Sequence, residues 1–285
     1  MKHLNLLLTG LLCLLFTFSC QQDEIVIAPE DAIPSEILLK LNEIGFNTID
    51  FQVKTFEEGY LVENDIYLTE SQINKMSVGR GIPAVEQYST DNLVSTSGSR
   101  VITIYAPEEG TSTRGKKTSG YSPAMIAGLD LAIARYNAEN LEISFQRVTS
   151  SSSADIVMTR LSRRDERRGV LGSAGFPTAS GDPYDEIKMS GVLESSYGLD
   201  TEGIATIIAH EMGHCVGFRH TDYFDRSISC GGSTSNEGDG GVGANHIPGT
   251  PTGATYSAQS WMLSCTDGSD RPFNNDDKTA LDYLY

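Results

Sequence analysis

The sequence predicts an α+β fold, and three of its features carry that prediction. Alternating, β-branched segments typical of strands are mixed in order with segments whose apolar residues recur at helical spacing. Between the last two predicted helices the chain is long, rich in glycine and without periodicity. A length of 285 residues with 39% hydrophobic residues suffices for one sizeable domain and a smaller segment.

The N-terminus is typical of an exported protein. Lys2 precedes an apolar run over residues 4–18, which is too short for a comfortable membrane span and indicates an export signal. The run ends in a small residue followed by Cys20, which resembles the lipobox of bacterial lipoproteins, although Thr17 stands where leucine is usual. We therefore expect lipidation at Cys20, with ordinary signal cleavage as the alternative. The expected location is the cell surface, the outer membrane or the periplasm.

The sequence divides the chain into four expected segments. Residues 1–20 are expected to form the lipoprotein signal peptide. Residues 21–33 are acidic and contain two prolines, as a tether does. Residues 34–99 are expected to form a small unit with a linker, and residues 100–285 the main domain.

In the small unit, apolar residues at helical spacing over residues 37–44 predict a helix that Gly45 ends. Residues 51–53 and 60–62 are predicted strands around a turn that contains glycine. Residues 78–99 are rich in Gly, Ser, Thr and Asp, and we expect them to form the linker.

The main domain is expected to begin with a strand over residues 101–105. Ser122 is a suitable N-cap for a helix with Pro123 at its first position. A second helix is predicted over residues 201–216. The remaining elements are strands over residues 143–148, 154–159 and 187–190 and a last helix over residues 276–284.

The formal net charge of −17 excludes some partners. Non-specific binding to nucleic acid or to anionic lipid needs a basic surface. We therefore expect no nucleic-acid partner, contact with a membrane only through a lipid anchor, and a monomer.

The pattern that carries chemistry is HEMGH at residues 210–214, inside the predicted helix. Positions four apart lie on the same helix face, so His210 and His214 can bind one metal ion. Glu211 lies between them, beside the metal, where a base for a metal-bound water belongs. The opposite face is apolar, so the helix can be buried on one side and present ligands on the other.

His220 is the predicted third ligand. Gly217 falls where the helix should end, and glycine adopts the left-handed conformation that turns the chain. His220, three residues on, can then return to the same ion. Three protein ligands with an open fourth position describe a catalytic zinc site. The competing interpretation is a cluster of buried histidines, which would have to satisfy each ring with hydrogen bonds.

The extended pattern HExxHxxGxxH resembles the signature of the metzincin clan of metallopeptidases. That clan also has a methionine-containing turn beneath the zinc, for which Met262 is the candidate. The sequences HEMGHCVGFRHTD at residues 210–222 and GANHIPGT at residues 243–250, with the lipoprotein start, resemble the bacterial dual-action HEIGH metallopeptidases. This resemblance spans about residues 100–285 and, more weakly, residues 34–77. Ser264 stands where several metzincins have a tyrosine that helps to stabilise the oxyanion.

The resemblance implies a twisted mixed sheet, an active-site helix and a C-terminal subdomain with the methionine turn, preceded by a propeptide-like unit. It implies a zinc-dependent endopeptidase in which the ion activates a water and Glu211 is the general base. An edge strand within residues 169–176 would pair with an extended protein or peptide substrate. Asp65 is a candidate for holding the open zinc position in a propeptide, although we favour an ordinary solvated turn there.

Other assignments stay open at this level. The oxyanion partner is one of Tyr256, His246 and Arg219, and His246 is as well explained as an exposed loop residue. Calcium binding at Asp239 is unsupported, because no repeated acidic pattern surrounds it.

Apart from Cys13 and Cys20, which belong to the signal, the chain holds three cysteines, which allow one bridge and one free thiol. Cys230 and Cys265 flank the glycine-rich region and form one of the pairings, whereas Cys215 is either a buried apolar residue or a bridge end.

Two further functions compete with the peptidase. One is a lipid-anchored binding protein with a vestigial zinc site, and the other is a zinc hydrolase that acts on cell-wall amide bonds. The intact Glu211 favours an enzyme.

Overall fold

The structure is a computed structural model that describes residues 32–44, 46, 48, 52–75, 87–110, 120–234, 236–237, 242–251 and 259–285. The predicted signal peptide, its Cys20 and nearly all of the tether lie outside the described residues. Residues Ile33–Tyr285 cluster as one compact unit, and the description below concerns this unit. Among its described helices, none has the length and apolar character that a membrane crossing needs.

The described part of the unit contains a mixed eight-stranded sheet, as expected for an α+β fold. The strand order is β1-β2-β3-β8-β9-β7-β5-β6. The pairs β3–β8, β9–β7, β7–β5 and β5–β6 are parallel, and the other three are antiparallel. The strands are β1 (Lys54–Phe56), β2 (Gly59–Val62), β3 (Ile66–Thr69), β5 (Arg100–Tyr105), β6 (Ile143–Val148), β7 (Ile156–Arg160), β8 (Gly172–Ala174) and β9 (Glu186–Met189).

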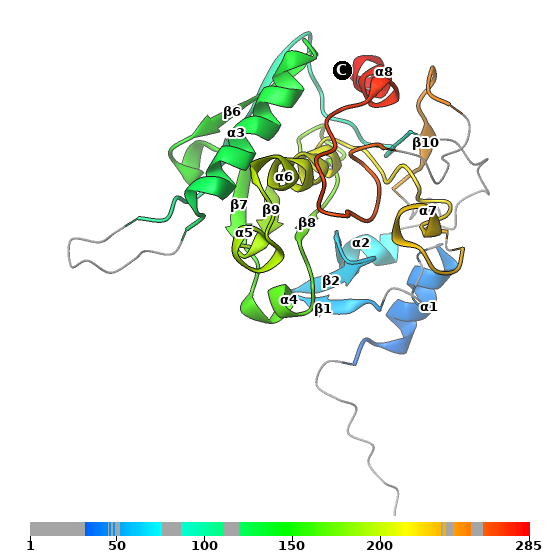
Figure 1. The fold of residues 1–285 in the computed structure, drawn as a ribbon. Coiled ribbons are helices and arrows are strands. Elements are labelled where there is room, and N and C mark those ends of the chain that lie inside the picture. The colour runs from blue at the N-terminus through cyan, green and yellow to red at the C-terminus, as the bar shows by residue number, and fades with distance from the viewer. Residues whose placement is uncertain are drawn as a thin grey trace, which may run out of the picture. The chain divides into compact units, whose positions relative to one another are not determined.

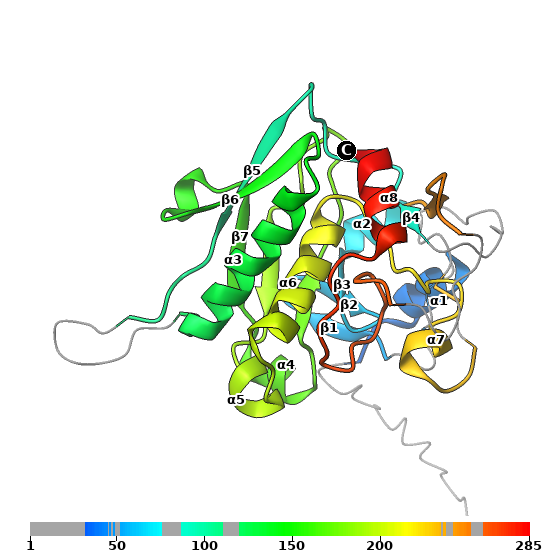
Figure 2. The same ribbon diagram turned by 45° about the horizontal axis from the view of Figure 1, so that its top comes forward.

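Two helices, α3 (Pro123–Ala138) and α6 (Thr201–Cys215), lie side by side on one face of this sheet (Figure 2). As predicted, Ser122 caps α3, because its hydroxyl accepts a hydrogen bond from the Met125 amide. Gly128 lets the two helices approach closely, since a Cβ there would lie 2.5 Å from Cγ2 of Ile204. The main hydrophobic core lies between these helices and the sheet.

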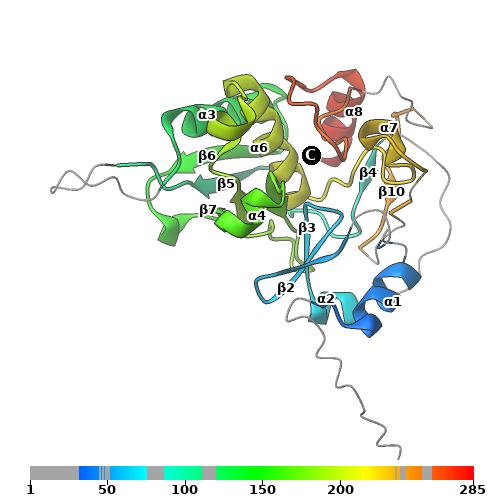
Figure 3. The same cartoon turned by 60° about the horizontal axis from the view of Figure 1, so that its bottom comes forward.

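The N-terminal segment adds three strands to the same sheet, and β3 pairs in parallel with β8 through Ile66 and Ala174. Helices α1 (Ser35–Glu43) and α2 (Glu70–Lys75) lie next to β2 and β3 (Figures 1 and 3). The strand predicted over residues 51–53 is wrong in position. It begins at Lys54, because the tight turn that starts at Glu57, with its positive φ, directly joins β1 to β2.

The described end of the predicted linker, residues 87–99, is packed into the unit, so the expectation of a linker is wrong there. β4 (Tyr88–Ser89) pairs with β10 (Asn245–His246) in a small second sheet. The amide of Gln87 donates to the carboxylate of Asp277 at 2.6 Å. Small polar residues predicted a linker, but here they are bonded to distant segments.

The other helices are short, apart from the last. Helix α8 begins one residue earlier than predicted, after Asn274, whose side chain forms a capping box with Asp277. The bounds are η1 (Ser151–Ser153), α4 (Arg163–Arg167), α5 (Leu193–Tyr197), α7 (Ser227–Cys230) and α8 (Asn275–Leu284).

Candidate metal centre

Helix α6 carries the predicted motif and is buried on every side from Gly203 to Cys215. Asp200 caps the helix by accepting a hydrogen bond from the Gly203 amide at 2.9 Å. The apolar face packs in the main core, as expected. The face with His210 and His214 is covered by other segments of the chain, so its polar groups need partners within the protein.

The imidazole rings of all three predicted ligands meet in one cluster. His210 and His214 each donate from Nδ1 to a main-chain carbonyl oxygen at 2.9 Å. His220 donates from Nδ1 to the carboxylate of Glu237 at 2.8 Å. A neutral ring that donates from Nδ1 has its Nε2 lone pair available for a metal. The bonds of His210 and His214 therefore select the tautomer that a metal ligand needs. Against burial, the carboxylates of Glu237 and then Asp65 raise the pKa of His220 to about 10, so this ring must release its second proton when it binds a metal.

Gly217 makes the turn that brings His220 back to the helix. Its φ of 103° is in the left-handed region, and a Cβ there would lie 2.8 Å from Cδ2 of Leu93. After this turn, the Arg219 amide donates to the Tyr88 carbonyl oxygen at 2.9 Å. The chain that carries the third histidine is thereby fixed to β4.

The cluster fits a metal ion. Ligand atoms from the three histidines and Asp65 all lie within 4.8 Å of one another. Among the described atoms, the buried Nε2 of His214 has no hydrogen-bond partner, which a bound ion would remedy. Burial, followed by repulsion from neighbouring imidazoles, lowers the pKa of His210 to about 4 and that of His214 well below its usual value. Both rings are thus neutral, as metal ligands must be.

Glu211 points its carboxylate into a cavity beside the cluster. The residue is buried, and its Oε2 has no hydrogen-bond partner among the described atoms. Burial, and then the charge of Asp65, raise the pKa of this carboxyl well above its usual range. A Cβ on Gly172 of β8 would lie only 2.2 Å from Oε1 of Glu211. The position of the carboxylate therefore requires glycine at this point of the strand.

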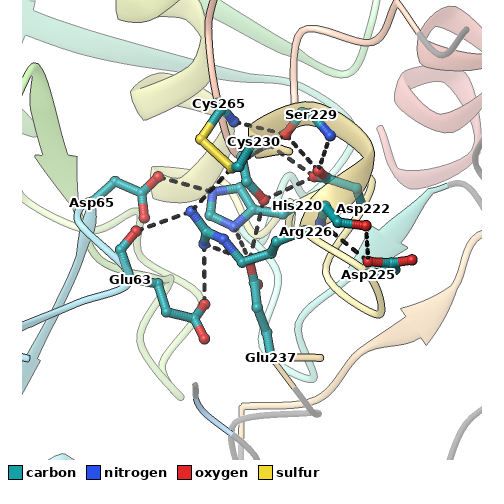
Figure 4. Close-up of a disulfide and its surroundings, with 12 residues drawn as sticks. Glu63, Asp65, His220, Asp222, Asp225, Arg226, Ser229, Cys230, Glu237 and Cys265 are labelled. Atoms are coloured by element: carbon teal, nitrogen blue, oxygen red, sulfur yellow. Dashed lines mark hydrogen bonds and ion pairs between the residues drawn. A yellow bond between two sulfur atoms is a disulfide. The ribbon is translucent and has the colours of Figure 1, made fainter. Parts of the chain in front are cut away.

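A buried ionic network surrounds His220, and no pattern in the sequence predicts it. Arg226 donates to Glu237 at 2.6 Å and to Glu63 at 3.3 Å (Figure 4). Arg219 lies 3.6 Å from the other oxygen of Glu237. Although burial opposes it, His220 and then Arg226 hold the pKa of Glu237 well below its usual range. Glu237 is therefore an anion that fixes the third histidine.

The carboxylate of Asp65 points into the cluster of three histidines, so the expectation of a solvated turn is wrong. Its Oδ2 lies 3.1 Å from Nε2 of His220 and 3.9 Å from Nε2 of His210, and its side chain is 13% exposed. Asp65 ends the turn between β2 and β3, in which Glu63 and Asn64 both have positive φ. Arg226 holds this turn by donating to the carbonyl oxygen of Glu63 at 3.1 Å (Figure 4). The turn's bonds to a distant arginine explain its burial.

The segment around Met262 lies directly under the helix. The carbonyl oxygen of Trp261 accepts the Nδ1 hydrogen of His210, and that of Met262 accepts the amide hydrogen of Thr221. A Cβ on Gly213 would lie 2.6 Å from Sδ of Met262, so the motif's glycine permits this approach.

The hydroxyl of Ser264 donates to Asp222 at 2.8 Å. Nearby, Cys230 and Cys265 form a disulfide (Figure 4), and Cys215 is a free, buried thiol. The structure thus decides which of the cysteine pairings forms.

Two of the three oxyanion candidates can be located, and neither lines the cavity at Glu211. Arg219 is fully buried and donates to the Gly243 carbonyl oxygen at 2.8 Å. His246 lies on β10, with Nε2 3.2 Å from the Thr250 hydroxyl. Tyr256 and the calcium candidate Asp239 lie outside the described residues.

The cavity has a volume of about 260 Å³ and runs along α6 from the cluster toward the helix N-terminus. Its α6 wall contains Thr206 and Ile207, one turn before His210 and Glu211. The turn of Asn64 and Asp65, the strand segment at Gly172 and the segment 261–266 complete the wall, with Arg168, Arg226 and Arg271 as its cationic groups.

A histidine pair on a helix, a third histidine after a glycine turn and a carboxylate that faces a cavity define the site of a metal-dependent hydrolase. A family model described as "Dual-action HEIGH metallo-peptidase" matches residues 60–285. The chain therefore belongs to the dual-action HEIGH metallopeptidase family, with Met212 in the place of the isoleucine in HEIGH.

No curated protein matches this sequence. Among solved structures, one described as "Structure of myroilysin" is similar at 15% identity and a TM-score of 0.36, over 66% of this chain and 95% of that one. One described as "GM1 bound form of the ECX AB5 holotoxin" is similar at 15% identity and a TM-score of 0.32, over 66% and 78%. A second myroilysin crystal structure has 16% identity and a TM-score of 0.33, over 75% and 95%. We draw nothing from these resemblances, because the TM-scores are below 0.5.

Proposed function

We propose that this metallopeptidase is a zinc-dependent endopeptidase in which His210, His214 and His220 hold the ion and Glu211 is the general base. One observation carries the proposal: three imidazoles converge beside a buried carboxylate at the wall of a cavity. Zinc in such a site supplies a water of lowered pKa and polarises a carbonyl oxygen.

The protein's own groups divide the remaining work. The Nδ1 hydrogen bonds orient the three rings. Glu211, whose Oε2 has no partner among the described atoms, accepts the proton of the attacking water and donates it to the leaving amine. Met262 forms the turn beneath the ligands. These roles are those that the sequence pattern predicts.

We further propose that the N-terminal unit is an inhibitory propeptide. Asp65 lies where a fourth ligand would bind, within 3.1 Å of His220. In addition, β3 pairs with β8, which lies within the predicted substrate-binding segment 169–176. Removal of this unit would free both the ion's open position and the strand edge for an extended peptide. Export through the signal peptide and lipidation at Cys20 complete the proposal of a monomeric surface or periplasmic enzyme.

The test is digestion of a mixture of proteome-derived peptides, with zinc measured in the same samples, for the wild type, Asp65→Ala and Glu211→Gln. We expect Asp65→Ala to cleave peptides and Glu211→Gln to lose nearly all turnover while retaining its zinc. Equal activity in Glu211→Gln would overturn the role of the base. Zinc binding with no cleavage by Asp65→Ala would favour the binding protein with a vestigial site, and cleavage of muropeptides alone would favour a cell-wall hydrolase.

A further inference from the structure

The cavity at Glu211 has in its wall a buried arginine with unused hydrogen-bond donors. Arg271 is 8% exposed and lines the cavity together with Glu211 and His210. Its Nε has no hydrogen-bond partner among the described residues. Leaving a buried N–H of a cation without a partner costs free energy, which an acceptor brought into the cavity beside it would recover.

Arg271 is held in a fixed position relative to the metal cluster. Its amide donates to the hydroxyl of Thr206 at 2.9 Å, and Thr206 lies one turn before His210 on α6. Its Nη1 donates to the carbonyl oxygen of Cys265 at 2.9 Å, next to the disulfide. A guanidinium that is already immobile loses little entropy when it binds a ligand.

The other two cationic groups of the cavity differ from Arg271. Arg226 lies between the buried carboxylates of Glu63 and Glu237, which offset its charge. Arg168 is exposed, so water screens it. Among the described residues, the carboxylate paired with Arg271 is that of Asp267, at 3.3 Å. The side chain of Asp267 is 68% exposed, so water screens this carboxylate and it offsets the charge of Arg271 only in part.

We propose that Arg271 makes this cavity a binding site for an acidic side chain of the substrate. On the basis of the proposed peptidase function, the enzyme cleaves bonds next to an aspartate or a glutamate. The side-chain carboxylate would accept hydrogen bonds from the Nε side of the guanidinium, a geometry that arginine provides and lysine does not. Thr206 and Ile207 would contact the rest of that side chain from α6.

The test uses two peptides that differ only by glutamate or glutamine next to the cleaved bond, with the zinc-loaded full chain carrying Asp65→Ala. We expect kcat/KM to favour glutamate on the order of tenfold or more, as for a hydrogen bond to a charged group. Arg271→Gln should bring the ratio close to one, and Arg271→Lys should keep part of it. Arg147→Gln, on the edge strand β6 and outside the cavity wall, removes the same charge and should leave the ratio unchanged.

Binding of the same two peptides to Glu211→Gln in the Asp65→Ala background separates this inference from the proposed function. Preference for glutamate in binding, lost in Arg271→Gln, would support the site even if no variant cleaves a peptide. Cleavage without preference for glutamate, or a preference that Arg271→Gln retains, would overturn the site and leave the peptidase intact. Zinc content and the melting temperature show whether Arg271→Gln is folded. If it is not, Arg271→Lys is used instead: a reduced preference for glutamate supports the site, and an unchanged preference overturns it.

Discussion

Among the three histidines of the cluster, only His220 donates its Nδ1 hydrogen to a carboxylate, that of Glu237, whereas the other two donate to main chain. This ligand lies outside the helix, so its orientation depends on side chains. Arg226 bonds both to Glu237 and to the turn that carries Asp65. The third ligand and the N-terminal segment are therefore linked through one arginine.

Glu237→Gln should weaken zinc binding by about 10- to 100-fold, because a partner of a metal-bound histidine sets the ring's orientation and basicity. Competition with a chelator measures the affinity. Glu186→Gln, on β9, is the control for loss of a partly buried carboxylate. Unchanged zinc affinity in Glu237→Gln would show that the network supports the fold but not the ligand.

Asp277 should make stability depend on pH. Burial raises its pKa to about 7, against hydrogen bonds from Ser260 and the amide of Asn274. Since the folded state then binds more protons than the unfolded state, stability from this group is largest at low pH and is lost as the pH rises from about 4 to 7, by at most about 4 kcal/mol. Chemical unfolding across this range should show a flatter profile for Asp277→Asn. The exposed Asp282→Asn should follow the wild type.

The cluster of three histidines could be predicted from the sequence because helical spacing and one glycine turn place all three rings. Asp65 could be named only as a candidate and Glu237 not at all, because they lie on loops 155 and 17 residues away from His220, the histidine that both reach. Contacts of this kind depend on how distant segments close over the site. For Asp65 the sequence shows only that a carboxylate stands at this position. Its burial depends on the hydrogen bond from Arg226 to the carbonyl oxygen of Glu63.

At the scale of elements, β8 positions Glu211, the proposed general base, through Gly172. Gly172→Ala would place a methyl group where Oε1 of Glu211 lies, 2.2 Å from the added Cβ. Because the carboxylate can rotate away, we expect a loss of turnover of at least tenfold, with little change in melting temperature. Ser173→Ala, next on the strand, removes a buried hydroxyl without a partner among the described residues and is the control. Full activity in Gly172→Ala would mean that Glu211 need not hold its position.

The elements of the main domain were predictable because their local signals agree. β6 spans the predicted residues, and α3 has the predicted cap and proline. The N-terminal unit was less predictable, since β3 depends on pairing with β8, more than a hundred residues later. The strand propensity of residues 66–69 alone does not reveal which distant strand they pair with.

At the scale of the whole molecule, the N-terminal segment belongs to the same sheet as the helix-bearing half and covers the metal cluster. Asp65→Ala should raise the peptidase activity of the full chain on the order of tenfold or more, because it opens the ion's fourth position. Activation should stay incomplete, since β3 remains paired with β8. Steady-state cleavage of a fluorogenic peptide measures this. Glu70→Ala, an exposed change on α2, is the control. An unchanged rate in Asp65→Ala would argue against inhibition by this carboxylate.

X-ray absorption at the zinc edge of the metal-loaded chain tests the central claim most directly, since it counts the ion's ligands and identifies them. The structure predicts one zinc per chain with three imidazole nitrogens at about 2.0–2.1 Å and oxygen in the remaining position. In His220→Ala, one of the nitrogens should be lost. A sulfur ligand, or an unchanged nitrogen count in His220→Ala, would contradict the assignment of this site.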